Sequence, residues 1–159
     1  MTVTIAPFTD HHLTRRYVDW LNDPEVTKFS EQRHIEHTQG SCMEYVLKMR
    51  KQGLLWAILK GKQHIGNISA HLDEPNWNAD ISILIGEGRG EGIGTDAFQQ
   101  VCAHLKHIGY RRLTCGCMAR NKPMIAIAKK NGFHIEGNRP AHFLVNKIGV
   151  ALVEMGKFV

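Results

Sequence analysis

The sequence predicts a single α+β layered domain over residues 1–159, in which helices flank a mixed central sheet. Its 159 residues are enough for one hydrophobic core, and no repeat, linker or low-complexity tract divides them. Segments with the two-residue period of strands alternate along the chain with segments of helical period. Elements interleaved in this way pack as layers, with helices lying against a sheet.

The N-terminal part is expected to contain one strand followed by helices. Val3–Phe8 has the pattern of a first strand, and Asp10 stands where the N-cap of a helix over His11–Leu21 would be. Pro24 favours a new first helical turn just after that helix ends. Thr38–Lys51 carries apolar residues near one helical stripe and predicts a longer helix.

The middle of the chain predicts three successive strands. Leu54–Leu59 and His64–Leu72 have strand patterns, and the compact turn Lys60–Lys62 between them indicates a hairpin. Ala79–Ile85 then alternates between apolar and polar positions with a clear period of two.

The C-terminal half alternates helices with strands. Ile93–Ile108 has the apolar stripe of an amphipathic helix, and the alternation over Leu113–Cys117 predicts a strand. Asn121 stands at the N-cap position of a helix that ends near Gly132. The remaining residues, Phe133–Val159, have strand patterns.

The net charge of the chain favours anionic partners without identifying one. The formal charge is +5 at pH 7, which suits nucleic acid or a phosphorylated coenzyme. The basic residues are spread along the chain, and no stretch interleaves aromatic and basic side chains as single-strand-binding proteins do. We therefore expect no nucleic-acid partner.

Nothing in the sequence indicates a membrane or secretory role. No apolar run approaches the roughly 18–20 residues that cross a bilayer, and Met1–Asp10 lacks the pattern of a secretory signal. The four cysteines form no C-x-x-C pair, and we expect them to be buried, reduced thiols. The ten histidines form no H-x-x-x-H pattern with a matched acid, so no metal site is expected. We predict a cytoplasmic protein without a metal.

The most informative segment is a glycine-rich loop between the strand ending at Ile85 and the helix beginning at Ile93. Glycine occupies every second position from Gly86 to Gly94. Glycine allows backbone conformations that side chains forbid, and the helix after the loop directs free N–H groups and its positive dipole end toward it. With Arg89 these features predict a binding site for a diphosphate.

The spacing within this loop excludes two common phosphate-binding motifs. Neither the dinucleotide pattern G-x-G-x-x-G nor the G-K-[ST] of a P-loop can be placed on it. The pattern is instead Arg89-x-x-Gly92-x-Gly94.

Arg89–Ala97 resembles the acetyl-coenzyme A loop of the GCN5-related N-acetyltransferases, the GNAT superfamily. A second segment, Asn121–Phe133, is similar to a later helix of that family, which usually ends in lysine, any residue, glycine and phenylalanine. Tyr17–Val26 further resembles members that act on ribosomal-protein N-termini or on nucleotide-linked amino sugars. The resemblance implies a mostly antiparallel sheet, an acyl-CoA N-acyltransferase domain and acetyl-CoA as co-substrate.

The resemblance also implies which residues contact the coenzyme. Backbone N–H groups of Gly90–Thr95 would hold the diphosphate, with Arg89 assisting, and the pantetheine arm would pair with Ser82–Ile85 as an extra strand. An N–H near Ile83 or Leu84 would face the thioester oxygen. The full set of expected coenzyme-binding residues is Ile83, Leu84, Ile85, Arg89, Gly90, Glu91, Gly92, Ile93, Gly94, Thr95, Asn121 and Lys130.

Acetyl transfer to an amine needs a group that accepts the amine's proton. Asp80 is the first candidate, because it lies on the strand that enters the site, near where many family members have a glutamate. Glu31 and His34 belong to a polar segment expected near the acceptor, and they are rival candidates. Many relatives also have a tyrosine four residues before the later glycine, where it protonates the leaving thiolate, but this chain has Ala128 there.

The sequence determines neither the acceptor amine nor the oligomeric state. A nucleotide-linked amino sugar, a protein N-terminus and a small metabolite amine are all compatible with the motifs. The polar segment Asn22–His37 slightly favours the sugar, since it could contact hydroxyls and phosphates. Ala128 keeps open a non-catalytic acyl-CoA sensor, and charge alone suggests a nucleic-acid-binding domain. Monomer and homodimer are both compatible with the sequence.

Overall fold

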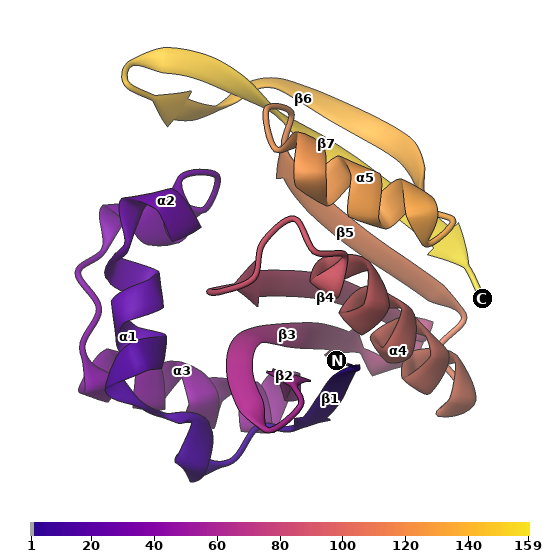
Figure 1. Cartoon of the computed structure of the whole chain (residues 1–159). Coiled ribbons are helices and arrows are strands. Elements are labelled where there is room, and N and C mark those ends of the chain that lie inside the picture. The colour runs from indigo at the N-terminus through magenta and orange to yellow at the C-terminus, as the bar shows by residue number, and fades with distance from the viewer. Residues whose placement is uncertain (1) are drawn as a thin grey trace.

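A computed structural model describes residues 2–159 and shows one seven-stranded sheet with helices on both faces (Figure 1). The strands are β1 (Val3–Pro7), β2 (Gly53–Lys60), β3 (Gln63–Asp73), β4 (Asn78–Ile85), β5 (Arg112–Met118), β6 (His134–Val145) and β7 (Ile148–Phe158). Their order is β1-β2-β3-β4-β5-β7-β6, and every neighbouring pair is antiparallel except β4–β5. The predicted mixed, mostly antiparallel sheet is therefore confirmed.

Helices α3, α4 and α5 lie where the sequence predicts them. The α-helices are α1 (Arg15–Asn22), α2 (Pro24–Thr27), α3 (Gln39–Gln52), α4 (Ile93–His107) and α5 (Lys122–Lys130), and the 3₁₀ turns are η1 (Asp10–His12), η2 (Glu31–His34) and η3 (Glu74–Asn76). No helix within residues 2–159 combines the length and the apolar character needed to cross a bilayer.

The start of the first α-helix differs from the prediction. The helix begins at Arg15, and its N-cap is Thr14, whose hydroxyl accepts the Tyr17 N–H at 3.3 Å. Asp10 lies instead in the preceding 3₁₀ turn, where its carboxylate accepts from Arg50 at 2.8 Å. Asp10 and Thr14 are both good capping residues, so the local sequence does not separate their roles.

Two hydrophobic clusters hold the helices to opposite faces of the sheet. Helices α4 and α5 pack on one face, where Phe98 and Leu105 meet inward residues of the strands such as Ile81. Helices α1 and α3 pack on the other face, where Trp20 and Val46 are buried. The odd-numbered residues of β4 enter the first cluster, whereas Leu84 packs against the second, as strand alternation requires.

The parallel pair β4–β5 is short, and this opens the sheet. Residues 78–80 pair with residues 112–114, and within the described chain no further pair joins the two strands. Beyond Asp80 and Thr114 the strands separate, so residues 81–85 of β4 have no strand partner on that side. This unpaired strand edge lies between the two groups of helices.

Three contacts attach the loop after β4 to the N-terminal helices. The α-carbon of Gly86 lies against the Trp20 ring, so closely that a Cβ there would be 2.1 Å from a ring atom. Arg16 of α1 forms an ion pair with Glu87, and Arg89 donates to the Glu25 carbonyl of α2 at 2.7 Å. The loop is therefore held in place by α1 and α2.

Replacing Gly86 with alanine should test this attachment. The added methyl overlaps the Trp20 ring, so we expect a loss of about 1–3 kcal/mol of unfolding free energy. Gly40→Ala is the matched control, because a Cβ at that helical position comes no closer than 3.7 Å to another atom and alanine favours the helix. Urea unfolding of both variants measures the difference, and equal midpoints would contradict the close packing.

Candidate active site

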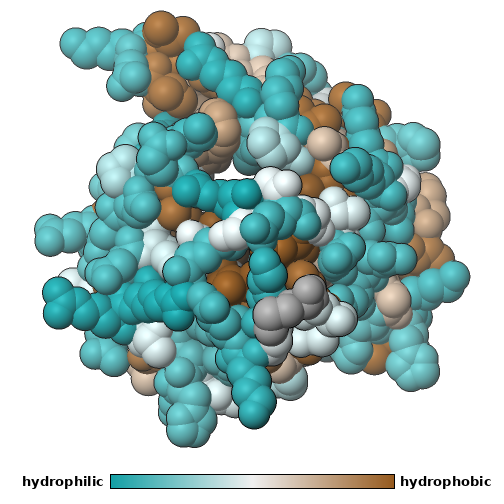
Figure 2. Space-filling view, in the orientation of Figure 1, coloured by the Kyte–Doolittle hydropathy of each residue, from teal (hydrophilic) through white to brown (hydrophobic). Residues whose placement is uncertain are grey.

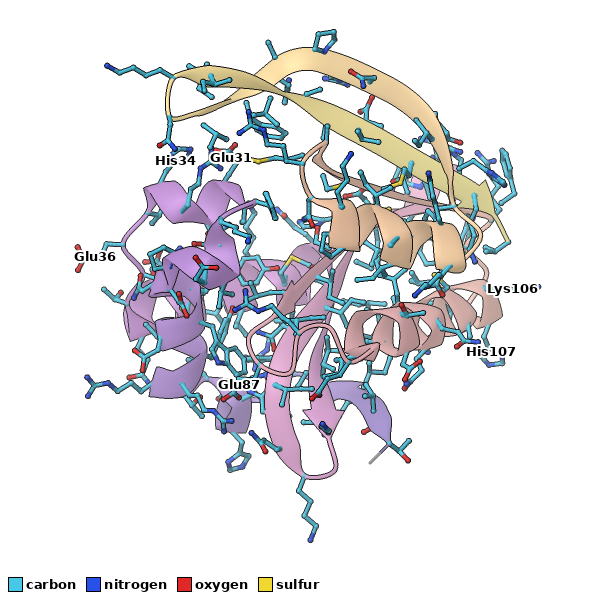
Figure 3. All side chains as sticks on the ribbon, turned by 45° about the horizontal axis from the view of Figure 1, so that its top comes forward. Glu31, His34, Glu36, Glu87, Lys106 and His107 are labelled. Carbon is cyan, nitrogen blue, oxygen red and sulfur yellow. The ribbon has the colours of Figure 1, made fainter. Side chains whose placement is uncertain are left out.

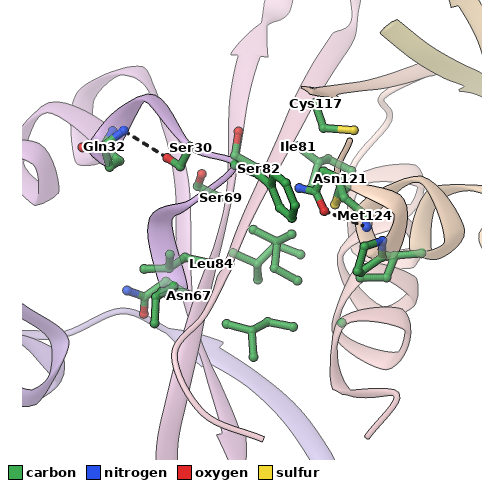
Figure 4. Close-up of a pocket in the computed structure, with 18 of the residues that line it drawn as sticks. Ser30, Gln32, Asn67, Ser69, Ile81, Ser82, Leu84, Cys117, Asn121 and Met124 are labelled. Carbon is green, nitrogen blue, oxygen red and sulfur yellow. Dashed lines mark hydrogen bonds between the residues drawn. The ribbon is translucent and has the colours of Figure 1, made fainter. Parts of the chain in front are cut away.

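A cleft of about 1090 Å³ opens where β4 and β5 separate. One part is lined by β4, the glycine-rich loop and the first turns of α4 and α5, and the other by the α1–α3 segment and strand β3 (Figure 4). Phe143 and Leu152 of the β6–β7 hairpin line it from above. The space-filling view shows the hollow beneath this overhanging hairpin (Figure 2).

At one end of the cleft, the loop presents backbone N–H groups. Gly88, Gly90 and Gly92 all have positive φ angles, of 71°, 86° and 79°, which side chains rarely adopt. Gly92 is the N-cap of α4 and has no side chain to satisfy the first turn, whose N–H groups lack intrahelical partners. A Cβ at Gly90 or Gly92 would meet nothing within 4 Å, so this backbone faces open space that a diphosphate can fill.

Gly94 has a different role from the glycines before it. A Cβ at this position would lie 2.5 Å from Ile127 of α5 and 3.0 Å from Ile85. Its lack of a side chain thus lets α4 and α5 approach each other below the loop. Among the five alternating glycines, Gly86 and Gly94 serve packing, and the three between them serve the conformation of the loop.

The structure brings most of the predicted coenzyme residues together. The predicted residues that line the cleft are Glu31, Ile83, Leu84, Ile85, Arg89, Gly90, Gly92, Ile93, Gly94, Thr95, Asn121 and Lys130. Three predicted residues, Asp80, His34 and Glu91, are not in its lining. The Glu91 carboxylate pairs with Lys60 of β2 at 2.9 Å.

Asn121 caps helix α5 as predicted, and it lies at the cleft. Its side-chain oxygen accepts the Met124 N–H at 3.2 Å and so caps α5, and the residue also lines the cleft (Figure 4). Its amide nitrogen is left available for a ligand.

The other end of the cleft has a polar floor. Ser69 and His71 of β3 and Ser82 of β4 line it, together with Tyr45 of α3, whose hydroxyl is 3.5 Å from the Ser69 oxygen. Burial raises the pKa of Tyr45, so its hydroxyl stays neutral. These β3 residues were not among the predicted site residues, although polar residues at every second position of the predicted strand, Asn67, Ser69 and His71, indicate a polar face.

At this end of the cleft, Arg33 connects the η2 segment to the β6–β7 hairpin. Arg33 of η2 donates to the Ser30 carbonyl at 2.8 Å and to the Leu144 carbonyl, at the β6–β7 turn, at 2.9 Å. Glu31 and His34, 2.8 Å apart, lie below the hairpin at the rim (Figure 3). Both are exposed, and Glu31 is also 3.5 Å from Arg33.

Asp80 lies where β4 and β5 part. Its carboxylate accepts from the Thr114 hydroxyl at 2.7 Å, and it is the cross-strand partner of His71. Desolvation by the surrounding side chains raises the pKa of Asp80, while the Thr114 hydrogen bond and the nearby His71 act in the opposite direction.

The four cysteines of the chain are buried. Cys42, Cys102, Cys115 and Cys117 are all buried free thiols, as predicted. Cys117 also lines the cleft, and burial raises its pKa to about 11. Within residues 2–159, no three His, Cys, Asp or Glu side chains are grouped as metal ligands.

A glycine-rich loop that opens onto a separated pair of parallel strands defines an acyltransferase fold of the GNAT kind. A family model described as an acetyltransferase (GNAT) domain matches residues 2–134. The chain therefore belongs to the GNAT family of acetyltransferases, and the predicted family is confirmed.

Individual relatives agree with this assignment. A ribosomal-protein-serine acetyltransferase of Escherichia coli (strain K12) is 32% identical over 120 residues, which cover 74% of this chain and 65% of the relative. A GNAT-family acetyltransferase structure from Streptococcus pneumoniae superimposes with a TM-score of 0.82 at 19% identity, covering 99% of both chains. RimL, a ribosomal L7/L12 α-N-protein acetyltransferase solved with coenzyme A, gives 0.85 at 17% identity and covers 100% of this chain and 95% of its own.

Replacing Gly92 with valine should separate ligand binding from folding. The positive φ at this position strains any side chain by about 1–3 kcal/mol, and relief of that strain reorients the N–H groups of the loop. We expect a folded variant that does not bind acetyl-CoA in calorimetric titration.

Gly61→Val is the control for this experiment. Gly61 has a φ of 63° in the β2–β3 turn and is not among the residues that line the cleft, so it carries the same backbone strain without the ligand. Normal acetyl-CoA binding by a folded Gly92→Val protein would show that the coenzyme site lies elsewhere.

Proposed function

We propose that this protein is an acetyl-CoA-dependent N-acetyltransferase that moves the acetyl group to a primary amine. The observation that carries the proposal is the position of the glycine-rich loop. Its free N–H groups lie at one end of a cleft that continues along the unpaired edge of β4. A diphosphate with an extended, amide-containing arm fits such a site, because the arm can complete the hydrogen bonds of the strand.

The proposed coenzyme contacts follow the cleft from the loop inward. Gly90–Thr95 would hold the diphosphate through backbone N–H groups, with Arg89 and Lys130 adding positive charge at the entrance. The edge of Ser82–Ile85 would pair with the pantetheine arm, and an N–H at Ile83 or Leu84 would stabilise the oxyanion that forms on the thioester. Arg89 is bound to the Glu25 carbonyl, which holds it at the loop.

We further propose direct transfer, without an acyl-enzyme. Burial raises the pKa of Cys102 and Cys117 to about 11 and that of Cys115 to about 12. At neutral pH these thiols are protonated and poor nucleophiles. Ala128 is fully buried and offers no hydroxyl to the leaving group, but a thiol with an ordinary pKa near 8.5 can leave as the thiolate.

The proposed acceptor is a protein N-terminus. The relative from Escherichia coli is named for a ribosomal-protein serine, and the cleft has the polarity that an N-terminal peptide needs. Its acceptor end has hydroxyl and amide groups on the floor and Glu31 at the rim, which would attract an ammonium group. Among the described lining residues at that end, Lys28 is the only lysine or arginine, which suits a nucleotide diphosphate poorly.

Turnover distinguishes the enzyme from a sensor. Acetyl-CoA at about 100 times its dissociation constant should stabilise the folded chain by about 2.7 kcal/mol in a thermal-shift assay, and duplex DNA or RNA should not. With acetyl-CoA and a panel of acceptors, we expect release of free coenzyme thiol, fastest with short peptides that begin with serine.

The same assay gives the outcomes that decide against the proposal. Faster thiol release with a nucleotide-linked amino sugar than with any peptide would replace the acceptor that we propose. Tight acetyl-CoA binding without turnover of any amine would indicate that the protein is a coenzyme sensor and not an enzyme. Stabilisation by nucleic acid alone would favour a nucleic-acid-binding domain.

A further inference from the structure

We propose that His71 is the general base of the transfer and that Asp80 is a positioning residue that acts through it. This inference rests on the proposed function and deepens it, because it assigns the proton acceptor at the same site. It also changes the role of Asp80, the first candidate from the sequence.

The sheet places the two side chains next to each other. His71 of β3 and Asp80 of β4 are direct partners in the antiparallel register. Directly opposed residues of an antiparallel pair project to the same face, with Cβ atoms about 4.5–5.5 Å apart. That face is the one that carries Leu84 and Ser82, so both side chains lie on the acceptor side of the sheet.

Of the two residues, one lines the cleft and the other does not. His71 is part of the lining, whereas Asp80 is not. The Asp80 carboxylate is oriented from its other side by the Thr114 hydroxyl at 2.7 Å. Thr114, Asp80 and His71 thus lie in a row across β5, β4 and β3, and the imidazole is the member of the row that meets the cleft.

The position of the imidazole at the cleft, with the carboxylate next to it, suits a proton acceptor. An imidazole can accept a proton near neutral pH, and a carboxylate beside it stabilises the imidazolium that forms. Glu31 and His34 pair with each other at 2.8 Å at the rim, and His34 does not line the cleft. His71 is on the floor, one cross-strand pair beyond Ser69 and Ser82.

His71 is one same-face step along the sheet from Ser82, which precedes the proposed thioester position at Ile83 or Leu84. Successive same-face positions on a strand are about 7 Å apart, so His71 lies about that distance beyond the Ser69–Ser82 pair. An amine between this pair and the imidazole can reach the ring directly or through one water.

Other charged groups around the row affect its titration. Glu154 of β7 faces Asp80 and adds to the rise in the pKa of Asp80, although Arg139 neutralises it in part through an ion pair of 3.2 Å. Tyr45, from α3, stays neutral because burial raises its pKa. His71 is therefore the imidazole of this set that lines the cleft.

The proposed transfer starts from a protonated amine. The neutral imidazole takes one proton from the ammonium group, and the free amine attacks the thioester carbonyl carbon. The C–N bond forms, the C–S bond breaks, and the departing thiolate takes up the second proton that the nitrogen loses. The imidazolium then returns its proton to solvent.

The test compares the wild type with His71→Gln, Asp80→Asn and the double variant in the thiol-release assay between pH 5.5 and pH 9. We expect His71→Gln to lower kcat about 100-fold or more and to remove the rise of kcat with pH. Asp80→Asn should lower kcat less and move that rise to lower pH, because it removes the charge that stabilises the imidazolium. In the His71→Gln background, Asp80→Asn should have no further effect.

Controls separate this role from binding and folding. Calorimetric titration should give the same acetyl-CoA affinity for all variants. His107→Gln, at the far end of α4 (Figure 3), should leave kcat and its pH profile unchanged.

Three outcomes would overturn the inference. A His71→Gln protein with the wild-type pH profile would remove His71 as the base while leaving acetyl transfer intact. A full additional loss from Asp80→Asn in the His71→Gln background would show that Asp80 acts independently. Absence of turnover by the wild-type chain with every amine would overturn both this inference and the proposed enzyme.

Discussion

Three residue pairs hold β4 and β5 together, and the cleft depends on where those pairs stop. A parallel pair that continued would satisfy the backbone of β4 with β5 and leave no space between the two groups of helices. Because pairing ends at Asp80 and Thr114, the next residues of β4 present N–H and C=O groups to a cavity instead. The two hydrophobic clusters on opposite faces keep the sheet rigid around this opening.

The glycine-rich loop is positioned by elements far from it in sequence. Trp20 packs on Gly86, Arg16 pairs with Glu87, and Arg89 donates to a carbonyl of α2. The N-terminal helices therefore shape the acceptor side of the cleft and also hold the loop at its other end. A substitution that shifts α1 would therefore change the geometry at both ends of the cleft.

Local patterns predicted the elements well, because strands and helices are encoded by periodicity and caps that lie within a few residues. The helix over Gln39–Gln52 with Thr38 as its cap, and the β2–β3 hairpin, are examples. The loop was also predictable, since its glycines and Arg89 form one contiguous motif. The helix start at Thr14 was missed because Asp10 is an equally good capping residue by local sequence.

The acceptor end of the cleft was less predictable for the same physical reason. Glu31 lines the cleft, but its neighbour His34 does not, and periodicity says nothing about a short 3₁₀ turn. The end of the β4–β5 pairing has no local sequence signal, so neither the cleft nor the position of His71 in it could be derived from spacing. Polar residues on one face of β3 were the nearest available indication.

The contact between Arg33 and the β6–β7 turn has a consequence for how such a cleft can change. Arg33 recognises a main-chain oxygen of Leu144 and no side chain of the hairpin. The exposed side chains at that turn, such as Leu144 and Ile148, can therefore be exchanged without breaking the bridge. Substitutions on the hairpin can thus change which acceptor the cleft binds, while the hydrogen bond that attaches the hairpin to Arg33 is kept.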